Sequence, residues 1–142
     1  MTAQAYKDIT IFLVDDDDID YMAVQRSMKQ LGLINPLIRA KDGVEALDMF
    51  ADKQVKAPYL VLLDLNMPRM NGIEFLERLR SNDELSLSVV FVLTTSAADE
   101  DKYAAYSHHV AGYVVKNSLQ KGFINLFDML EHYCEIVELP YQ

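Results

Sequence analysis

The sequence predicts an α/β fold, a doubly wound five-stranded parallel sheet flanked by five helices. Short apolar runs alternate five times with stretches of helical periodicity along the chain. Strands that alternate with helices need crossover connections, which produce a mostly parallel sheet. The runs are apolar throughout, which indicates strands covered on both faces. With 142 residues, the chain is long enough to bury one substantial core.

The first strand is expected at residues 9–14, a run of β-branched and aromatic side chains that stops at the four consecutive aspartates 15–18. A helix is expected at residues 20–31, where apolar side chains recur at intervals of three and four. Gly32 marks the end of that helix.

The second strand is expected at residues 37–40. A turn at Asp42 and Gly43 leads into a helix that carries apolar side chains as far as Phe50. The third strand, residues 59–63, ends directly at Asp64.

A loop at residues 66–71 follows, and Gly72 opens the third helix. The fourth strand is expected at residues 89–93 and ends at Thr94. A helix with a weaker apolar pattern is expected at residues 99–107.

The fifth strand, residues 113–115, ends at Lys116, and the last helix is expected from residue 119 to about residue 133. One domain at residues 8–134, with no separate output domain, accounts for the pattern. Only the two ends, residues 1–7 and 138–142, are expected to be loose.

Composition and charge restrict the class of protein. The formal net charge is −9 at pH 7, so a nucleic-acid backbone or an anionic membrane would repel the chain, and neither is expected as a partner. The N-terminus shows no signal peptide, and no apolar run is long enough to span a bilayer. The single cysteine, Cys134, lies in an apolar segment and is expected to be buried. We therefore expect a soluble cytoplasmic protein.

Chemically active side chains follow four of the predicted strands at the point where each strand ends. The aspartates 15–18 follow the first strand, Asp64 the third, Thr94 the fourth and Lys116 the fifth. In an open parallel sheet, the carboxyl ends of the strands lie at one edge, where ligands bind. We therefore expect several carboxylates, a hydroxyl and an amine to meet there.

This combination suits phosphoryl transfer to a carboxylate. Asp15 and Asp16 beside Asp64 form a like-charge cluster that needs a cation or a proton to neutralise it. Hard oxygen ligands in this number suit Mg²⁺. Asp64 can then attack phosphorus in line and form an acyl phosphate. Lys116 would supply positive charge to the phosphoryl oxygens, and Thr94 would donate a hydrogen bond to one of them.

Four segments resemble the signature segments of two-component response-regulator receiver domains of the single-domain, chemotaxis type. They are residues 11–16 (IFLVDD), 62–72 (LLDLNMPRMNG), 93–96 (LTTS) and 112–116 (GYVVK). Asp64 lies thirty residues before Thr94, and Thr94 lies twenty-two before Lys116. The likeness covers nearly the whole chain. The extra length between Asp18 and Asp64, and before Thr94, is similar to small receivers that partner phytochrome-type or other hybrid histidine kinases.

The resemblance implies a flavodoxin-like receiver fold with Asp64 as the phospho-acceptor. It implies that Mg²⁺ (or Mn²⁺) is bound directly by Asp16 and through water by Asp15. It also implies that Asp64 and the backbone carbonyl of Asn66 contribute to the same metal site.

The resemblance further implies a conformational switch. Thr94 would shift toward the phosphoryl group and Tyr113 would change rotamer. The phosphoryl donor would be a sensor histidine kinase or a histidine phosphotransfer protein. The protein would not be a conventional enzyme, because it catalyses only its own phosphorylation and dephosphorylation. The signal would leave through the helix at 99–107, the strand at 113–115 and the last helix, toward a downstream protein target or a second copy in a homodimer.

The chain departs from the family pattern at four positions. Asn117 follows Lys116 where the family usually has proline, which would loosen this loop. Asp17 and Asp18 add charge beyond the usual pair, and one of them is expected to cap the first helix or face water. Thr95 stands where a small residue is common and bears on the lifetime of the phosphoryl group.

Two other functions can be formulated from the same residues. A metal-dependent phosphatase or phosphotransferase of the haloacid-dehalogenase type would use Asp16 and Asp18 as an Asp-x-Asp pair, but it leaves Asp64 idle and needs a cap domain. A flavodoxin-like cofactor carrier needs a phosphate-binding loop after the first strand. Four aspartates at that place would expel the phosphate of a flavin.

Overall fold

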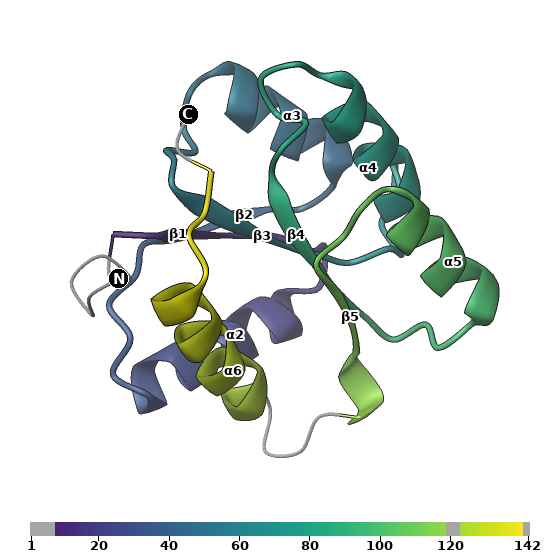
Figure 1. Ribbon diagram of the computed structural model, residues 1–142. Helices are drawn as coiled ribbons and strands as arrows, with labels where there is room; N and C mark the ends of the chain where they lie inside the picture. The colour runs from purple at the N-terminus through teal and green to yellow at the C-terminus, as the bar shows by residue number, and fades with distance from the viewer. Residues whose placement is uncertain (1–7, 119–122, 141–142) are drawn as a thin grey trace.

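Five parallel strands form one sheet in the computed structural model, which describes residues 8–118 and 123–140 (Figure 1). The strands are β1 (Thr10–Val14), β2 (Leu37–Ala40), β3 (Tyr59–Leu63), β4 (Val89–Thr94) and β5 (Gly112–Val115). Their order across the sheet is β2-β1-β3-β4-β5. The strand order therefore reverses between β1 and β3, the kind of switch point at which open sheets bind ligands. The predicted parallel sheet is confirmed, with each strand within one residue of its expected bounds.

Helices cover both faces of the sheet. They are α2 (Asp18–Gln30), α3 (Gly43–Ala51), α4 (Gly72–Ser81), α5 (Asp99–Ser107) and α6 (Ile124–Ile136). Figure 1 shows α2 and α6 on one face and α3, α4 and α5 on the other. This arrangement confirms the doubly wound architecture. Within the described ranges, no helix combines the length and the apolar composition that a membrane crossing requires.

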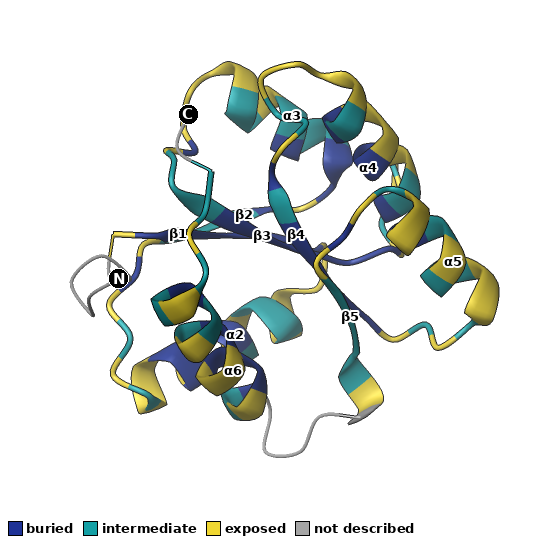
Figure 2. Ribbon diagram, viewed as in Figure 1, coloured by how far each residue is buried: buried dark blue, intermediate teal, exposed yellow. Residues whose placement is uncertain are grey.

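Successive residues of each strand point to opposite faces, and both faces are buried. In β1, Ile11 and Leu13 pack into the core beneath α2 and α6, whereas Phe12 and Val14 pack into the core beneath α3, α4 and α5. Figure 2 shows this burial as the dark central strands. Two apolar faces explain why the strands carry no alternation of apolar and polar residues. Cys134 is also fully buried, as expected, and burial raises the pKa of its thiol to about 12.

The ends of two helices differ from the sequence expectation. The first helix begins at Asp18, two residues earlier than predicted, because the side chain of Asp17 accepts a hydrogen bond from the backbone N–H of Ile19 (2.8 Å) and caps it. The last helix begins at Ile124 instead of residue 119, and residues 119–122 lie outside the described residues.

The expectation of loose ends is wrong for part of the C-terminus. Leu139 packs against the core beneath α2 and α6. The expectation for residues 1–7 and 141–142 falls on positions that lie outside the described residues.

The backbone that follows β3 leaves no space for a side chain at Gly72. A Cβ atom there would lie 2.6 Å from the backbone oxygen of Asp64 and 2.6 Å from the Cα of Leu65. We expect Gly72→Ala to lower the free energy of unfolding by about 1–3 kcal/mol, measured by urea denaturation, because backbone must move. Gly43→Ala is the matched comparison, since the closest atom there is the flexible Met70 side chain at 2.8 Å. An equal or larger loss in Gly43→Ala would contradict this interpretation.

Candidate functional site

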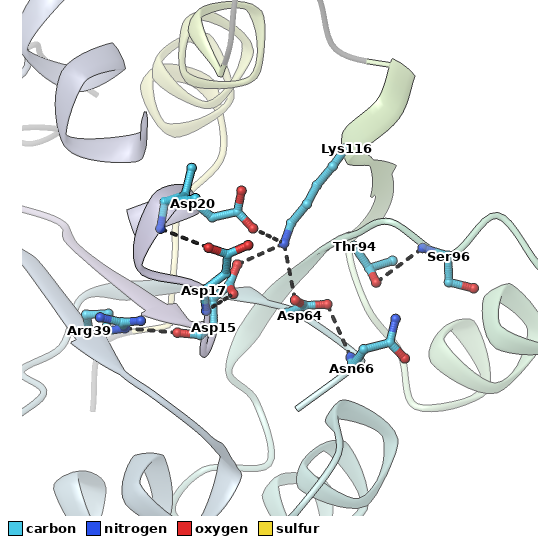
Figure 3. Close-up of polar contacts among 10 residues, drawn as sticks. Asp15, Asp17, Asp20, Arg39, Asp64, Asn66, Thr94, Ser96 and Lys116 are labelled. Carbon is cyan, nitrogen blue, oxygen red and sulfur yellow. Dashed lines mark hydrogen bonds and ion pairs between the residues drawn. The ribbon is translucent and has the colours of Figure 1, made fainter. Parts of the chain in front are cut away.

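The predicted site residues meet at the carboxyl ends of the strands. Lys116, directly after β5, donates hydrogen bonds from its Nζ to Oδ2 of Asp15 at 3.0 Å and to Oδ2 of Asp64 at 3.2 Å (Figure 3). Asp15 and Asp64 follow the neighbouring strands β1 and β3, and Thr94 ends β4, the next strand of the sheet. The topology therefore gathers carboxylates, an amine and a hydroxyl, as the sequence predicted.

Three carboxylates are placed close enough to share one cation. Asp15, Asp16 and Asp64 each offer an oxygen, and these oxygens lie within 4.8 Å of one another. Asp15 and Asp64 are buried, whereas Asp16 is exposed. No other group of three acidic, histidine or cysteine side chains in the described parts of the chain is arranged in this way. Oxygen donors of this kind fit a hard divalent ion such as Mg²⁺.

The other two aspartates of the run have separate roles. Asp17 caps α2, which confirms the expectation that one of the pair would be a helix cap. Asp18 is largely exposed and forms an ion pair with Arg39 at 2.8 Å. The guanidinium of Arg39 also donates from Nε to the backbone oxygen of Asp15 at 2.9 Å. Arg39 therefore holds the start of the acidic loop through both its backbone and a side chain. The sequence did not reveal this contact.

Asp15 is a buried carboxyl group that ionises with difficulty. Burial raises its pKa from 3.8 to about 6, although the backbone N–H of Asp17 and the ammonium of Lys116 oppose this shift. The remaining cost of the charged form is a physical reason for a cation to bind beside it.

Lys116 contacts a carboxylate that the sequence interpretation did not assign to the site. Its Nζ lies 2.5 Å from Oδ2 of Asp20 in the first turn of α2. Burial alone would lower the pKa of Lys116, but the hydrogen bond to Asp20 and the charges of Asp15 and Asp64 outweigh burial and raise it. The ammonium is therefore firmly protonated. Asp20 was missed because the helix was expected to begin at that residue instead of at Asp18.

Asp64 is oriented by two donors. Lys116 contacts Oδ2, and the backbone N–H of Asn66 donates to Oδ1 at 3.2 Å. Asn66 and Asp16 also line a cavity of about 400 Å³ beside the acidic cluster, together with Met67 and Asp101. Space for a ligand therefore adjoins the candidate nucleophile.

Thr94 and Tyr113 are linked through Ser96. The hydroxyl of Thr94 accepts a hydrogen bond from the backbone N–H of Ser96 at 3.4 Å, and the phenol of Tyr113 donates to the Ser96 carbonyl at 2.9 Å. The Ser96 hydroxyl donates to Asp101 of α5 at 2.5 Å. Thr94 is fully buried, and Tyr113 is half-buried. Ser96 was not expected to connect the two predicted switch residues, because a serine in a loop gives no pattern from which to infer its partners.

The loop after β3 is tied to α3 by a charged pair. Arg69 donates to both carboxylate oxygens of Asp42, at 2.8 and 3.0 Å, and Asp42 caps α3 through the backbone N–H of Glu45. Bidentate pairs of this type fix orientation as well as distance. The sequence predicted a turn at Asp42 but not this connection to the loop that carries Asn66.

Comparison with known proteins gives a consistent result. The family model described as the response regulator receiver domain matches residues 11–127. Response regulator Rcp1 from Synechocystis sp. (strain ATCC 27184 / PCC 6803 / Kazusa) is 35% identical over 136 residues, which are 92% of this chain and 92% of Rcp1.

Solved structures support the same conclusion. The crystal structure of the Mn²⁺-bound form of Rcp1 is 33% identical, covers 93% of this chain and 99% of its own, and superposes with a TM-score of 0.76. The structure of the phosphorylated cyanobacterial phytochrome response regulator RcpA is 29% identical, covers 94% and 99%, and has a TM-score of 0.75. The fold, the acidic edge of the sheet and these similarities together show that the chain belongs to the response regulator receiver domain family of two-component signalling.

Proposed function

We propose that the protein accepts a phosphoryl group on Asp64 from a phosphohistidine and transmits its presence by a conformational switch. The observation that carries this proposal is the Asp64 carboxylate, held by Lys116 and the Asn66 N–H inside a cluster of further carboxylates. A donor of this chemistry is a sensor histidine kinase or a histidine phosphotransfer protein. The receiver domain is proposed to occupy residues 8–134.

The acidic cluster fits Mg²⁺ or Mn²⁺. Asp15, Asp16 and Asp64 supply hard oxygen donors, and the backbone carbonyl of Asn66 is proposed as a further ligand. Burial raises the pKa of Asp15, which supports a cation here, because a positive charge nearby would stabilise the ionised carboxylate. When bound, the ion would neutralise negative charge between the cluster and the incoming phosphoryl group. Rcp1, a relative, has been crystallised in an Mn²⁺-bound form.

Each residue then has a defined task in the transfer. A carboxylate oxygen of Asp64 attacks phosphorus, the P–N bond of the phosphohistidine breaks, and its electron pair stays on the imidazole nitrogen. Lys116 stabilises the negative charge on the phosphoryl oxygens. Later, water attacks phosphorus and the bond to Asp64 breaks, which regenerates the carboxylate and releases phosphate. The protein thus resets itself and turns over no separate substrate.

The switch is proposed to act through Thr94 and Tyr113. If the Thr94 hydroxyl turns to a phosphoryl oxygen, it leaves the Ser96 N–H, and Ser96 also holds Tyr113. The change would reach the face formed by α5, β5 and α6, on which Tyr103 and Tyr106 are exposed. A downstream protein or a second copy would bind this face in the cytoplasm. The net charge of −9 makes nucleic acid and anionic membranes unfavourable partners.

The haloacid-dehalogenase alternative gains no support. Asp16 belongs to the acidic cluster, but Asp18 forms its ion pair with Arg39, so the two do not act as a catalytic Asp-x-Asp pair. Asp64, which that mechanism would leave idle, is contacted by Lys116. The flavodoxin-like alternative fails at the acidic loop, where an anionic phosphate group would face several carboxylates.

Replacement of the proposed acceptor tests the function directly. We expect Asp64→Asn to abolish phosphorylation by acetyl phosphate and Mg²⁺, because the amide is not a competent nucleophile. Intact-protein mass spectrometry with mapping of the modified residue measures this. Asp52→Asn, an exposed aspartate after α3, is the control and should label normally. Excess chelator should suppress labelling of the wild-type protein. Labelling mapped to Asp16 would instead favour the phosphatase mechanism.

The buried charge of Asp15 predicts a pH-dependent stability difference. The carboxyl group has a pKa of 3.8 when unfolded and about 6 when folded, so the stability that it contributes is lost as the pH rises through 6. Without metal, we expect Asp15→Asn to be more stable than the wild type at pH 8 by about 2 kcal/mol. The difference should be smaller at pH 4.5, where Asp15 is protonated in the fold, and should vanish only below 3.8, where it is protonated in the unfolded chain as well. Urea denaturation in chelator at both pH values measures this, and a variant less stable at pH 8 would refute it.

A change at Thr94 can separate the conformational switch from the phosphorylation of Asp64. We expect Thr94→Ala to retain phosphorylation of Asp64 but to lose the structural response that follows, because the hydroxyl that contacts Ser96 is gone. Hydrogen exchange across residues 95–113, with and without phosphorylation, reports this response. Thr95→Ala is the matched control, since Thr95 is exposed. An unaltered response in Thr94→Ala would show that the signal takes another route.

A further inference from the structure

The ammonium of Lys116 is fully occupied before any phosphoryl group arrives. It has three N–H donors, and three carboxylates accept from it, Asp20 at 2.5 Å, Asp15 at 3.0 Å and Asp64 at 3.2 Å (Figure 3). The shortest contact is to Asp20 and not to the proposed acceptor. A phosphoryl oxygen can therefore gain a hydrogen from Lys116 only if one carboxylate gives up its own.

Asp20 is the partner that can be released at the lowest cost. Asp64 must stay, because it carries the phosphoryl group, and Asp15 belongs to the acidic cluster and also accepts from the N–H of Asp17. Within the described residues, the carboxylate of Asp20 has no hydrogen bond other than that to Lys116. Its side chain is 20% exposed, compared with 1% for Asp15 and 8% for Asp64. Water can therefore replace Lys116 at Asp20 more easily than at the other two carboxylates.

We propose that Asp20 is a positioning residue that holds the Lys116 ammonium in the unphosphorylated protein and yields it when Asp64 is phosphorylated. This inference rests on the proposed function. Asp20 lies in the first turn of α2, which Asp17 caps, so the backbone that carries the Asp20 carboxylate is held in place. Lys116 is the first residue of a short 3₁₀ turn and is followed by Asn117. The hydrogen bond to Asp20 restrains the Lys116 ammonium in this turn.

The direction of the effect follows from the charges. The Asp20 carboxylate neutralises part of the positive charge that Lys116 would offer to the phosphoryl oxygens, and it adds negative charge near the approaching anion. Loss of the Asp20 charge should therefore speed the attack of Asp64 on acetyl phosphate, in which the P–O bond to acetate breaks and acetate leaves with the electron pair.

The experiment compares initial rates of Asp64 phosphorylation by acetyl phosphate at saturating Mg²⁺. We expect Asp20→Asn to be faster than the wild type by about three- to tenfold, the effect of releasing one charged hydrogen bond at a partly exposed site. Asp18→Asn removes the same charge two residues earlier in the chain, where the partner is Arg39, and should change the rate less than about twofold. Asp20→Glu restores the carboxylate and should return the rate toward that of the wild type. A slower or unchanged Asp20→Asn, or an equal gain in Asp18→Asn, would overturn the proposal.

A double-mutant cycle shows whether Asp20 acts through Lys116. In a Lys116→Met background, Asp20→Asn should increase the rate less than it does in the wild type, because only the direct repulsion between Asp20 and the approaching anion then remains. A second readout needs no phosphorylation. With chelator present, Asp20→Asn should have a lower urea midpoint than the wild type, because an ion pair is lost. In the Lys116→Met background the same change should raise the midpoint, because a repelling charge is removed. Equal shifts in both backgrounds would contradict the inference.

If the wild type itself fails to label at Asp64, the proposed function fails, whereas normal labelling with no effect of Asp20→Asn defeats only the role of Asp20.

Discussion

The cost of burying carboxylates side by side is the constraint around which this edge of the fold is organised. Asp15 and Asp64 lie at the ends of adjacent strands, and neither has enough water around it to screen its charge. Lys116 reaches both from the far side of β4 and partly balances them. Lys116 does not remove the whole cost of the charged form of Asp15, because burial still raises the pKa of this carboxyl group. A divalent cation would stabilise this partly neutralised cluster of carboxylates, so the fold itself favours binding of a cation at this edge.

The sequence was a good guide where the structure depends on local pattern or on topology. Runs such as residues 59–63, which Pro58 precedes and Asp64 follows, are apolar and rich in branched side chains, so their bounds were predicted closely. The meeting of Asp15, Asp64, Thr94 and Lys116 was also predictable, because all parallel strands end at the same edge. Neither inference required knowledge of any side-chain contact.

The sequence was a poor guide where a contact depends on how a helix or side chain is oriented in three dimensions. Lys116 and Asp20 are 96 residues apart, and their contact depends on α2 beginning at Asp18 and resting against the sheet at one angle. Arg39 lies in a short strand whose other residues are apolar, and its guanidinium packs over the Tyr21 ring and contacts the acidic loop. These residues contact the predicted ones and restrain them, so the sequence pattern located the candidate site residues but not the residues that position them.

The acidic cluster and the proposed switch are joined because Thr94 ends β4 and Lys116 follows the neighbouring strand β5. A phosphoryl group on Asp64 would attract the ammonium from one strand end and the hydroxyl from the other. If the Thr94 hydroxyl turned, the Ser96 N–H would lose its acceptor, and Ser96 also contacts Tyr113 and Asp101. Polar groups that are largely removed from water are costly to leave unpaired. The loss of one of these bonds therefore favours the rearrangement of the others, which would give the protein two discrete arrangements instead of a graded response.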